Sequence, residues 1–264
     1  MEETSFSIEE FEGHRVGRFG SPLVAVAETG STNLDALDKA ELSATEGTVV
    51  VADHQRSGRG RWGREWLGVP GASLMFSIVL RPEGDASLIT TALGVAAAEG
   101  IEALTGLPCK IKWPNDIEID GKKVAGTLVE SRSGAGRIQA LVAGMGVNVT
   151  LEAEDFPEDL RGRATSIGIE LLKRGERFPP SREQLLAAIL IAFETRYPVD
   201  PAVIVSDAMA RSSVLGGEVT VTNSDGSTIT GTATRLLDDG ALELSTPDGT
   251  VAVAAGEISS LRPA

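Results

Sequence analysis

The sequence contains very little cysteine and histidine. Its 264 residues include one cysteine, Cys109, and two histidines, His14 and His54. A single cysteine excludes an intrachain disulfide, and so few soft ligands leave no basis for a structural zinc site. A magnesium ion is not excluded, because it needs only carboxylates, water molecules and substrate phosphates. The sequence predicts a protein of a reducing, cytoplasmic compartment.

Positive charge and long apolar runs are also scarce. Lys and Arg number 24 against 38 Asp and Glu, and 24 minus 38 gives the formal net charge of −14. This excess of negative charge disfavours broad binding to nucleic acid or to anionic lipid. No uncharged run reaches the roughly 18 residues of a membrane-spanning helix. The acidic start MEETSFSIEEF is unlike a secretory signal. We expect neither nucleic acid nor a membrane as a partner.

The remaining composition is that of a folded globular chain. Hydrophobic residues make up 42% and charged residues 23% of the sequence, close to the average of globular domains. At about 150 residues per domain, the length predicts one large domain with a small appendage.

The pattern of the first 215 residues predicts a mixed α+β domain. Apolar periodicity and turn residues predict a largely antiparallel sheet with packed helices. We expect helices over 34–44, 86–105, 184–197 and 201–211, and strands over 47–53, 73–81, 109–119, 123–131 and 137–147, with a turn at 133–136.

From residue 216 to residue 264 the pattern of apolar residues and turn motifs changes. Short alternating segments are separated by SDG, DDG and PDG turns, a pattern typical of a small all-β barrel. This part has no aromatic residue for stacking on bases, which disfavours binding of single-stranded nucleic acid. We therefore predict a domain of residues 1–215 followed by a barrel of residues 216–264.

One loop concentrates arginine and glycine in this otherwise acidic chain. The segment 55–66 reads QRSGRGRWGREW. Glycines let backbone N–H groups face a ligand, and guanidinium groups match phosphate or carboxylate oxygens. The segment predicts an anion site, with a solvated surface loop as the alternative. A dinucleotide-binding fingerprint is rejected, because Pro70 follows and no helix opens at the loop.

A second cluster, KIKWPND, covers residues 110–116 and is followed by KKVAG at 122–126. Lys110 and Lys112 would share one strand face. A carboxylate beside an amide at a strand end, as at Asn115 and Asp116, suits the orientation of a nucleophile, although it is also common turn chemistry. Lys123 could reach a ligand anion or lie in solvent.

Four motifs in this order resemble the catalytic domain of biotin protein ligases. They are GRGRxGRxW at 58–66, KWPND at 112–116, KxAGxLxE at 123–130 and GxGxN at 144–148. The resemblance extends over about residues 24 to 262. It implies a sheet like that of class II aminoacyl-tRNA synthetases, followed by a Src-homology-3-like barrel.

The resemblance also implies an activity. Biotin and Mg-ATP would give biotinyl-5'-adenylate, and the biotinyl group would pass to a lysine of a biotin carboxyl carrier domain of a carboxylase. The expected substrates are ATP and biotin, with Mg²⁺ held mainly by substrate phosphates.

The resemblance implies roles for residues that match these motifs. The expected catalytic residues are Lys123, Arg59, Arg61 and Asp116. Biotin would contact Ser31, Thr32, Asn33, Gln55, Gly58, Arg59, Gly60, Arg61, Lys123, Gly126 and Gly144. The nucleotide would contact Arg59, Arg61, Arg64, Trp66, Lys112, Asn115 and Asn148. Without this resemblance, Ser31 and Thr32 read as helix caps and Trp66 as a core residue.

Many biotin protein ligases carry an N-terminal DNA-binding domain, whereas the motifs here begin near Glu28. We therefore expect a monofunctional ligase without a repressor function. Two alternatives remain: a lipoate or octanoate ligase of the same fold, and a non-catalytic biotin or nucleotide sensor. A hydrolase based on His54 is disfavoured, since Asp53 would point to the opposite strand face.

Overall fold

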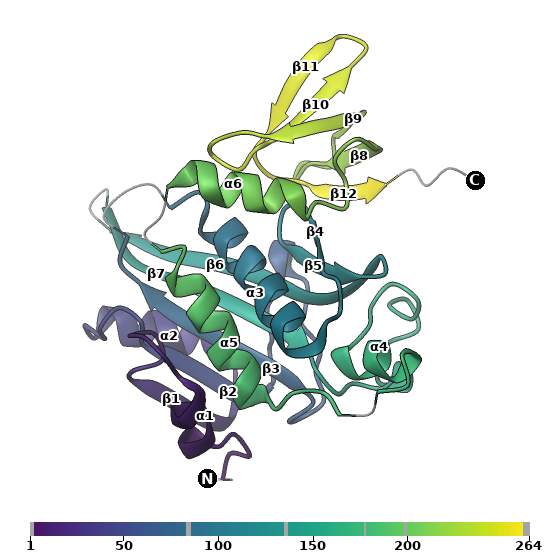
Figure 1. Cartoon of the computed structure of the whole chain (residues 1–264). Helices are drawn as coiled ribbons and strands as arrows, with labels where there is room; N and C mark the ends of the chain where they lie inside the picture. Colours follow the sequence, from purple (N-terminus) through teal and green to yellow (C-terminus); the bar gives the residue numbers. More distant parts are fainter. Residues whose placement is uncertain (1–2, 83–85, 135–136, 177, 198–199, 261–264) are drawn as a thin grey trace.

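The computed structural model of the chain describes residues 3–82, 86–134, 137–176, 178–197 and 200–260. It contains a large sheet with helices packed on it and a smaller sheet formed by the C-terminal residues (Figure 1). The described helices are α1 (Ile8–His14), α2 (Thr32–Glu41), α3 (Ile89–Thr105), α4 (Ile167–Lys173), α5 (Arg182–Glu194) and α6 (Pro201–Ala210).

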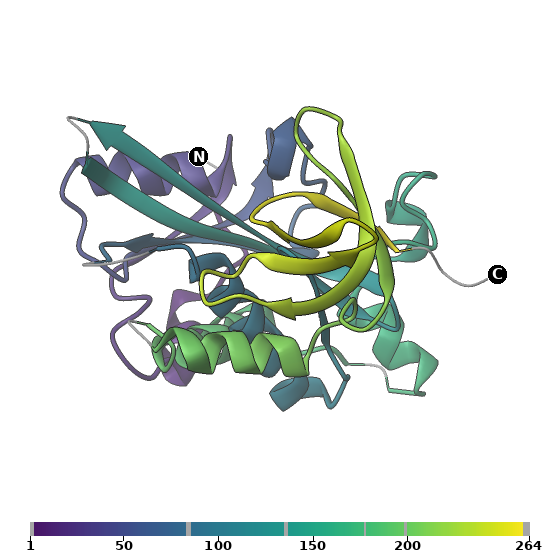
Figure 2. The ribbon, with the colours of Figure 1, turned by 90° about the horizontal axis from the view of Figure 1, so that it is seen from above.

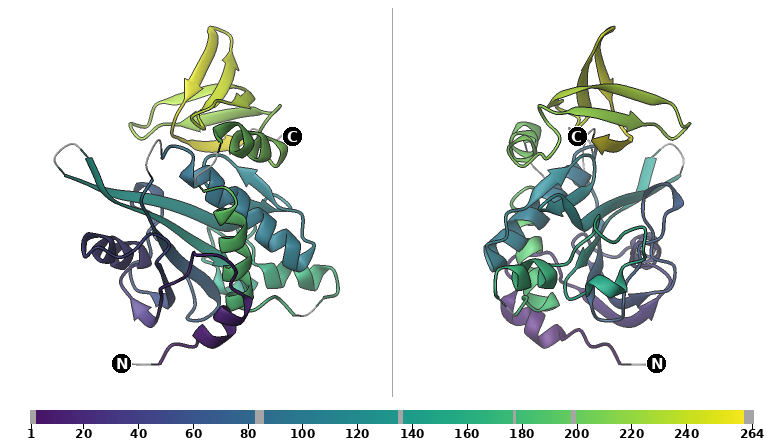
Figure 3. Two further views of the ribbon diagram at one scale, coloured as in Figure 1. Left: turned by 60° about the vertical axis from the view of Figure 1, so that its left-hand side comes forward. Right: turned by 90° about the vertical axis from the view of Figure 1, so that its right-hand side faces the viewer.

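The large sheet has seven strands in the order β1-β2-β3-β7-β6-β5-β4. Its strands are β1 (Leu23–Thr29), β2 (Val49–Gln55), β3 (Ser73–Leu80), β4 (Lys110–Lys112), β5 (Asp116–Ile119), β6 (Lys122–Gly134) and β7 (Arg137–Asn148). Only the pairing of β1 with β2 is parallel. β6 and β7 form a long hairpin that projects from the body of the molecule (Figure 3). The expected α+β class with a largely antiparallel sheet is confirmed.

The two faces of this sheet are covered differently. Alternating side chains of β3 divide between the faces, with Leu74, Phe76 and Ile78 in the main core beneath α3 and α5. On the opposite face, Val50 and Val79 pack against the buried side of α2. Because α2 is short, it covers only part of its face, and the remainder is left for a cavity.

The C-terminal residues form an antiparallel sheet in the order β11-β10-β9-β8-β12, which lies above α6 and the large sheet (Figures 1 and 2). The strands are β8 (Glu218–Thr222), β9 (Thr228–Leu236), β10 (Leu242–Thr246), β11 (Gly249–Val253) and β12 (Glu257–Ser260). The expected small C-terminal β domain is confirmed as an antiparallel sheet. Within the described residues β11 and β12 are not paired, so its barrel is not closed. The domain division at residue 215 stays a prediction.

Most elements agree with the sequence prediction, but three were missed. These are α1, the edge strand β1 and the short helix α4. The turn expected at 133–136 is wrong at its start, because β6 continues to Gly134; residues 135 and 136 lie outside the described residues. No helix in the described part of the chain is long and apolar enough to cross a membrane.

A buried ion pair anchors the N-terminal residues beneath the sheet. Asp53 at the end of β2 lies 2.8 Å from Arg182 of α5, and both side chains are nearly buried. The same carboxylate accepts hydrogen bonds from the Ser5 amide at 2.6 Å and the Thr4 hydroxyl at 3.0 Å. Burial alone would raise the pKa of Asp53, but these donors and Arg182 outweigh it and lower the pKa. The folded state therefore stabilises the charged form.

Asp53→Asn should lower the free energy of unfolding by about 3 kcal/mol at neutral pH, because it leaves Arg182 buried without an anion. The lowered pKa means that Asp53 stabilises the fold above its ordinary pKa of 3.8 and loses this effect as the pH falls through the folded-state value. The difference between wild type and variant should therefore shrink in acid. Urea denaturation at about pH 7 and about pH 3 measures it, and an equal difference at both would contradict the prediction.

Candidate active site

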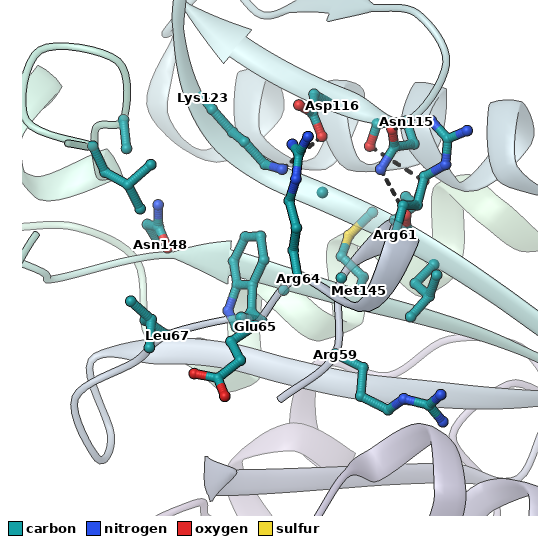
Figure 4. A pocket seen from close by; sticks show the side chains of 18 of the residues that line it. Arg59, Arg61, Arg64, Glu65, Leu67, Asn115, Asp116, Lys123, Met145 and Asn148 are labelled. Carbon is teal, nitrogen blue, oxygen red and sulfur yellow. Dashed lines mark hydrogen bonds and ion pairs between the residues drawn. The ribbon is translucent and has the colours of Figure 1, made fainter. Parts of the chain in front are cut away.

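A cavity of about 680 Å³ opens on the sheet face that carries α2. Its walls come from the N-terminus of α2, the loop between β2 and β3, strands β4 to β7, the segment 151–164 and the start of β12. Figure 4 shows side chains of several of these segments pointing into one space. The cavity therefore joins parts of the chain that lie far apart in the sequence.

Three glycines leave the floor of this cavity free of side chains. Gly126 of β6 pairs with Gly146 of β7, and Gly144 lies two residues before Gly146 on the same face. Each glycine is covered by a different functional side chain. A Cβ at Gly144 would overlap the Asn33 amide, a Cβ at Gly146 would overlap the indole of Trp66, and a Cβ at Gly126 would lie 3.1 Å from Lys123 Nζ.

Lys123 and Asp116 form an ion pair over Gly126. Lys123 Nζ lies 2.7 Å from Asp116 Oδ1, and the two side chains are 36% and 27% exposed, so a ligand can reach both. The ammonium also lies 5.4 Å from the centre of the Trp66 ring. The backbone of Lys123 is held by hydrogen bonds with Arg163 and Thr165. This places a fixed cation in the middle of the cavity (Figure 4).

The arginine- and glycine-rich loop is folded as a tight hairpin. The Trp66 amide donates to Gly58 O at 2.9 Å, and the Gly60 amide donates to Arg64 O at 2.7 Å. At its tip Trp62 has a positive φ of 57°. Gly58 lies at the base of this hairpin, where a Cβ would overlap Trp66 O. The hairpin directs its arginines in different directions (Figure 4).

Arg61 points toward the end of β4. It donates to Asn115 Oδ1 at 3.2 Å and to Gly256 O at 3.0 Å. Asn115 is held in turn by Thr127, whose carbonyl accepts from Asn115 Nδ2 at 3.0 Å. Burial lowers the pKa of Arg61, which Asp116 and Glu257 partly oppose.

Arg64 bonds to the C-terminal sheet. Its guanidinium donates to both carboxylate oxygens of Glu257, with NH1 at 2.6 Å from Oε1. Hydrogen bonding by Arg64 lowers the pKa of Glu257 against the opposing effect of burial, and Arg163 and Lys112 lower it further. Glu257 thus lies among three cations at the rim of the cavity.

The end of the cavity beside α2 is uncharged and polar. Gln55 Oε1 accepts from the Thr32 amide at 2.7 Å and from the Thr32 hydroxyl at 3.1 Å. Ser31 occupies the N-cap position of α2, but its side chain makes no capping hydrogen bond. The interpretation of Ser31 as a side-chain cap is therefore wrong.

Asn33 connects this polar end to Arg59. The Asn33 amide nitrogen donates to Leu128 O at 3.1 Å and to Glu130 at 2.8 Å. Glu130 also pairs with Arg59, at 3.1 Å. Arg59 extends away from Lys123 (Figure 4), so in this structure the two cations do not converge.

The opposite end of the cavity is formed by β7 and the segment that follows it. Asn148 is buried at the end of β7 and donates to Thr165 O at 2.9 Å. Phe156, Leu160 and Arg163 contribute to this wall. The indole nitrogen of Trp66 is buried and has no hydrogen-bond partner among the described residues.

All the predicted site residues except Gly58 line the cavity. Sequence analysis missed several residues that also line it or support it, namely Gly146, Thr127, Arg163 and Glu257. Gly146 is the second glycine of the GxGxN motif, and its place in that motif could have indicated that it lines the cavity. Arg163 and Glu257 carry no local pattern, because they reach the cavity only through the fold.

The described part of the chain contains no preformed set of protein ligands for a metal ion. No group of three or more His, Cys, Asp or Glu side chains there is arranged to hold an ion. The acidic groups nearest the centre, Asp116 and Glu257, are each paired with a cation.

Comparison with known proteins agrees with this geometry. Residues 26–148 match the Biotin/lipoate A/B protein ligase family, and residues 214–260 match the Biotin protein ligase C terminal domain. Over 252 residues the chain is 34% identical to the Biotin--[acetyl-CoA-carboxylase] ligase of Mycobacterium tuberculosis, covering 91% of this chain and 89% of that protein.

A solved structure and a longer relative extend the comparison. The chain resembles the biotin protein ligase from Aquifex aeolicus in complex with biotin and ATP, with a TM-score of 0.75, 29% identity and coverage of 91% and 99% of the two chains. It is 38% identical over 181 residues to the bifunctional ligase/repressor BirA of Bacillus spizizenii, covering 67% of this chain and 54% of that protein. The chain thus matches about half the length of that relative. Two family domains, a relative matched over most of its length and a shared fold show that this chain belongs to the biotin protein ligase family.

Proposed function

We propose that this protein activates biotin with ATP to biotinyl-5'-adenylate and transfers the biotinyl group to a lysine of a biotin carboxyl carrier domain. The observation that carries the proposal is the cavity itself. It joins an uncharged polar end at Ser31, Thr32 and Gln55 to a centre that holds Lys123. Biotin has groups in the matching order: an uncharged polar cyclic urea at one end and a carboxylate at the other.

In the first step a carboxylate oxygen of biotin would attack the α-phosphorus of ATP. A P–O bond forms, and the bond to pyrophosphate breaks. Both reactants are anions, so their approach requires positive charge that is already in place. Lys123 would contact the carboxylate, and Arg61 the α-phosphate. Arg64 would reach the phosphates after releasing Glu257.

Magnesium would accompany ATP in this step and neutralise phosphate charge. The described residues do not form a ligand set for it, so we assign no residue to the metal and derive no step from it.

In the second step the amine of the carrier lysine would attack the carbonyl carbon of the adenylate. A C–N bond forms, the bond to AMP breaks, and the amine loses a proton. Asp116 would orient this amine and accept the proton, with Asn115 beside it. Lys123 would stabilise the negative charge that grows on the carbonyl oxygen.

The nucleotide would occupy the end of the cavity near Asn148. Trp66 would cover the adenine, and the buried indole nitrogen would gain a partner there. Lys112, which lies 3.8 Å from Glu118, would be near the phosphates. We further propose that residues 1–215 carry both chemical steps and that residues 216–264 support them through Gly256 and Glu257.

ATP–pyrophosphate exchange tests the first step before any acceptor is known. We expect exchange that requires biotin and is absent with lipoate or octanoate. Exchange with either of these acids instead would keep the fold and overturn the substrate. Biotin binding without exchange would favour the sensor. Transfer of labelled biotin to a carrier domain, and its loss when the acceptor lysine is replaced by arginine, tests the second step.

A further inference from the structure

A fully buried serine lies directly behind the polar end of the cavity. Ser77 is 0% exposed and pairs in the sheet with Gly144. Its hydroxyl lies 2.8 Å from Thr32 Oγ1 and 2.6 Å from Asn33 Oδ1. Thr32 and Asn33 both line the cavity. Ser77 therefore contacts the two side chains that would face a ligand, without facing it.

The orientation of the Asn33 amide follows from its partners. Its nitrogen faces Leu128 O and the Glu130 carboxylate, which only accept hydrogen bonds. Its oxygen must then face the Ser77 hydroxyl. The bare backbone of Gly144 leaves room for the amide to lie across the sheet from β3 to β6. The orientation of Asn33 Oδ1 as an acceptor therefore depends on the hydrogen bond from the Ser77 hydroxyl.

The hydroxyl protons of this cluster are fewer than its oxygen–oxygen contacts. Three oxygen–oxygen contacts join its members: Ser77 to Thr32, Ser77 to Asn33, and Thr32 to Gln55 at 3.1 Å. The amide oxygens of Asn33 and Gln55 cannot donate, so only the two hydroxyl protons are available. At any moment one contact has no proton. Gln55 Oε1 also accepts from the Thr32 amide at 2.7 Å, so each amide oxygen can keep a donor, while lone pairs of the cluster remain open to a further donor.

We infer that Ser77 is a positioning residue that makes this end of the cavity an acceptor for ligand N–H groups. The inference rests on the proposed function and deepens it. The ureido ring of biotin brings two N–H donors, one of which can donate to an open lone pair of this cluster. An acyl chain such as that of octanoate or lipoate brings none, so the cluster selects against it.

The chain offers a matched control on the same strand. Ser73 is also 0% exposed and lies on the same face of β3, four residues earlier. Its hydroxyl has no hydrogen-bond partner among the described residues. Ser73→Ala therefore removes a buried hydroxyl from the same face and leaves the Thr32 and Asn33 cluster intact.

The experiment compares wild type, Ser77→Ala, Ser77→Cys and Ser73→Ala. Biotin binding is measured by titration calorimetry, and KM and kcat are measured by exchange at saturating ATP. We expect Ser77→Ala to weaken biotin binding about tenfold, which corresponds to about 1.4 kcal/mol. The kcat and the KM for ATP should stay close to wild type. Ser77→Cys, a weaker donor of similar size, should be intermediate, and Ser73→Ala should match wild type.

A second ligand separates positioning from general damage. Biotin methylated on a ureido nitrogen lacks one N–H donor and should bind wild type more weakly than biotin. In Ser77→Ala this penalty should shrink, because the acceptor is no longer oriented. An unchanged penalty, or unchanged biotin affinity in folded Ser77→Ala, would overturn the inference. Biotin binding without exchange in wild type would refute the proposed function alone, and calorimetry would still decide the role of Ser77.

Discussion

Lys123→Ala should lower biotin-dependent ATP–pyrophosphate exchange by about 100-fold or more, the effect typical of losing one preorganised charge at a reacting centre. Lys123 Nζ is fixed by Asp116 at 2.7 Å and lies over the bare backbone of Gly126. Its removal takes away the central cation and leaves Asp116 without its partner. Both the attacking carboxylate and the growing charge on the carbonyl oxygen would then be less stabilised.

The neighbouring lysine provides the control for this prediction. Lys122 lies beside Lys123 at the start of β6 but does not line the cavity. Lys122→Ala should therefore retain activity within about twofold, as expected of a surface substitution. Lys123→Arg keeps the charge but not its compact shape, and should recover only part of the rate. Equal losses at positions 122 and 123 would refute the assignment.

Gly144→Ala should raise the KM for biotin by at least about tenfold and lower the free energy of unfolding by about 1–3 kcal/mol. A Cβ at this position overlaps the Asn33 amide, which is held on three sides by Ser77, Leu128 and Glu130. Asn33 must leave its position, and the polar cluster loses an acceptor. Exchange kinetics and thermal unfolding measure the two effects.

Two further variants distinguish this clash from a general effect of alanine. Gly94 is a buried glycine inside α3, and a Cβ there would meet nothing within 4 Å. Gly94→Ala should therefore stabilise the protein by about 0.5–1 kcal/mol and leave the KM for biotin unchanged. Adding Asn33→Ala to Gly144→Ala should restore stability but not biotin affinity. If the double variant is no more stable than Gly144→Ala, the clash is not the cause.

Local pattern was sufficient for most of the elements. The β-branched residues of β2 and the proline-free alanine-rich run of α3 predict their own secondary structure. Strand β1 was missed because it lies at a sheet edge. Its parallel partner β2 is separated from it in the sequence by α2, so no hairpin turn marks the pair. The barrel was predicted from turn spacing. Turn spacing indicates antiparallel neighbours but does not determine whether β11 meets β12.

Within the site, local sequence was a good guide wherever a motif is continuous. Arg61, Asn115, Lys123 and Asn148 stand in such motifs, and all of them line the cavity. Gly58 stands in one too, yet the hairpin places it at the loop base. Glu257 could not be found, because 193 residues separate it from Arg64.

The sequence by itself determined the α+β class, the four motifs and most of the residues around the cavity, because periodicity, turn chemistry and motif spacing are local properties. Only the tertiary structure decided which groups meet. The antiparallel register of β3, β7 and β6 brings Ser77, Gly144 and Leu128 into one row under Asn33. The packing of the C-terminal sheet brings Glu257 to Arg64. Such contacts depend on chain segments that are distant in sequence, so no local pattern encodes them.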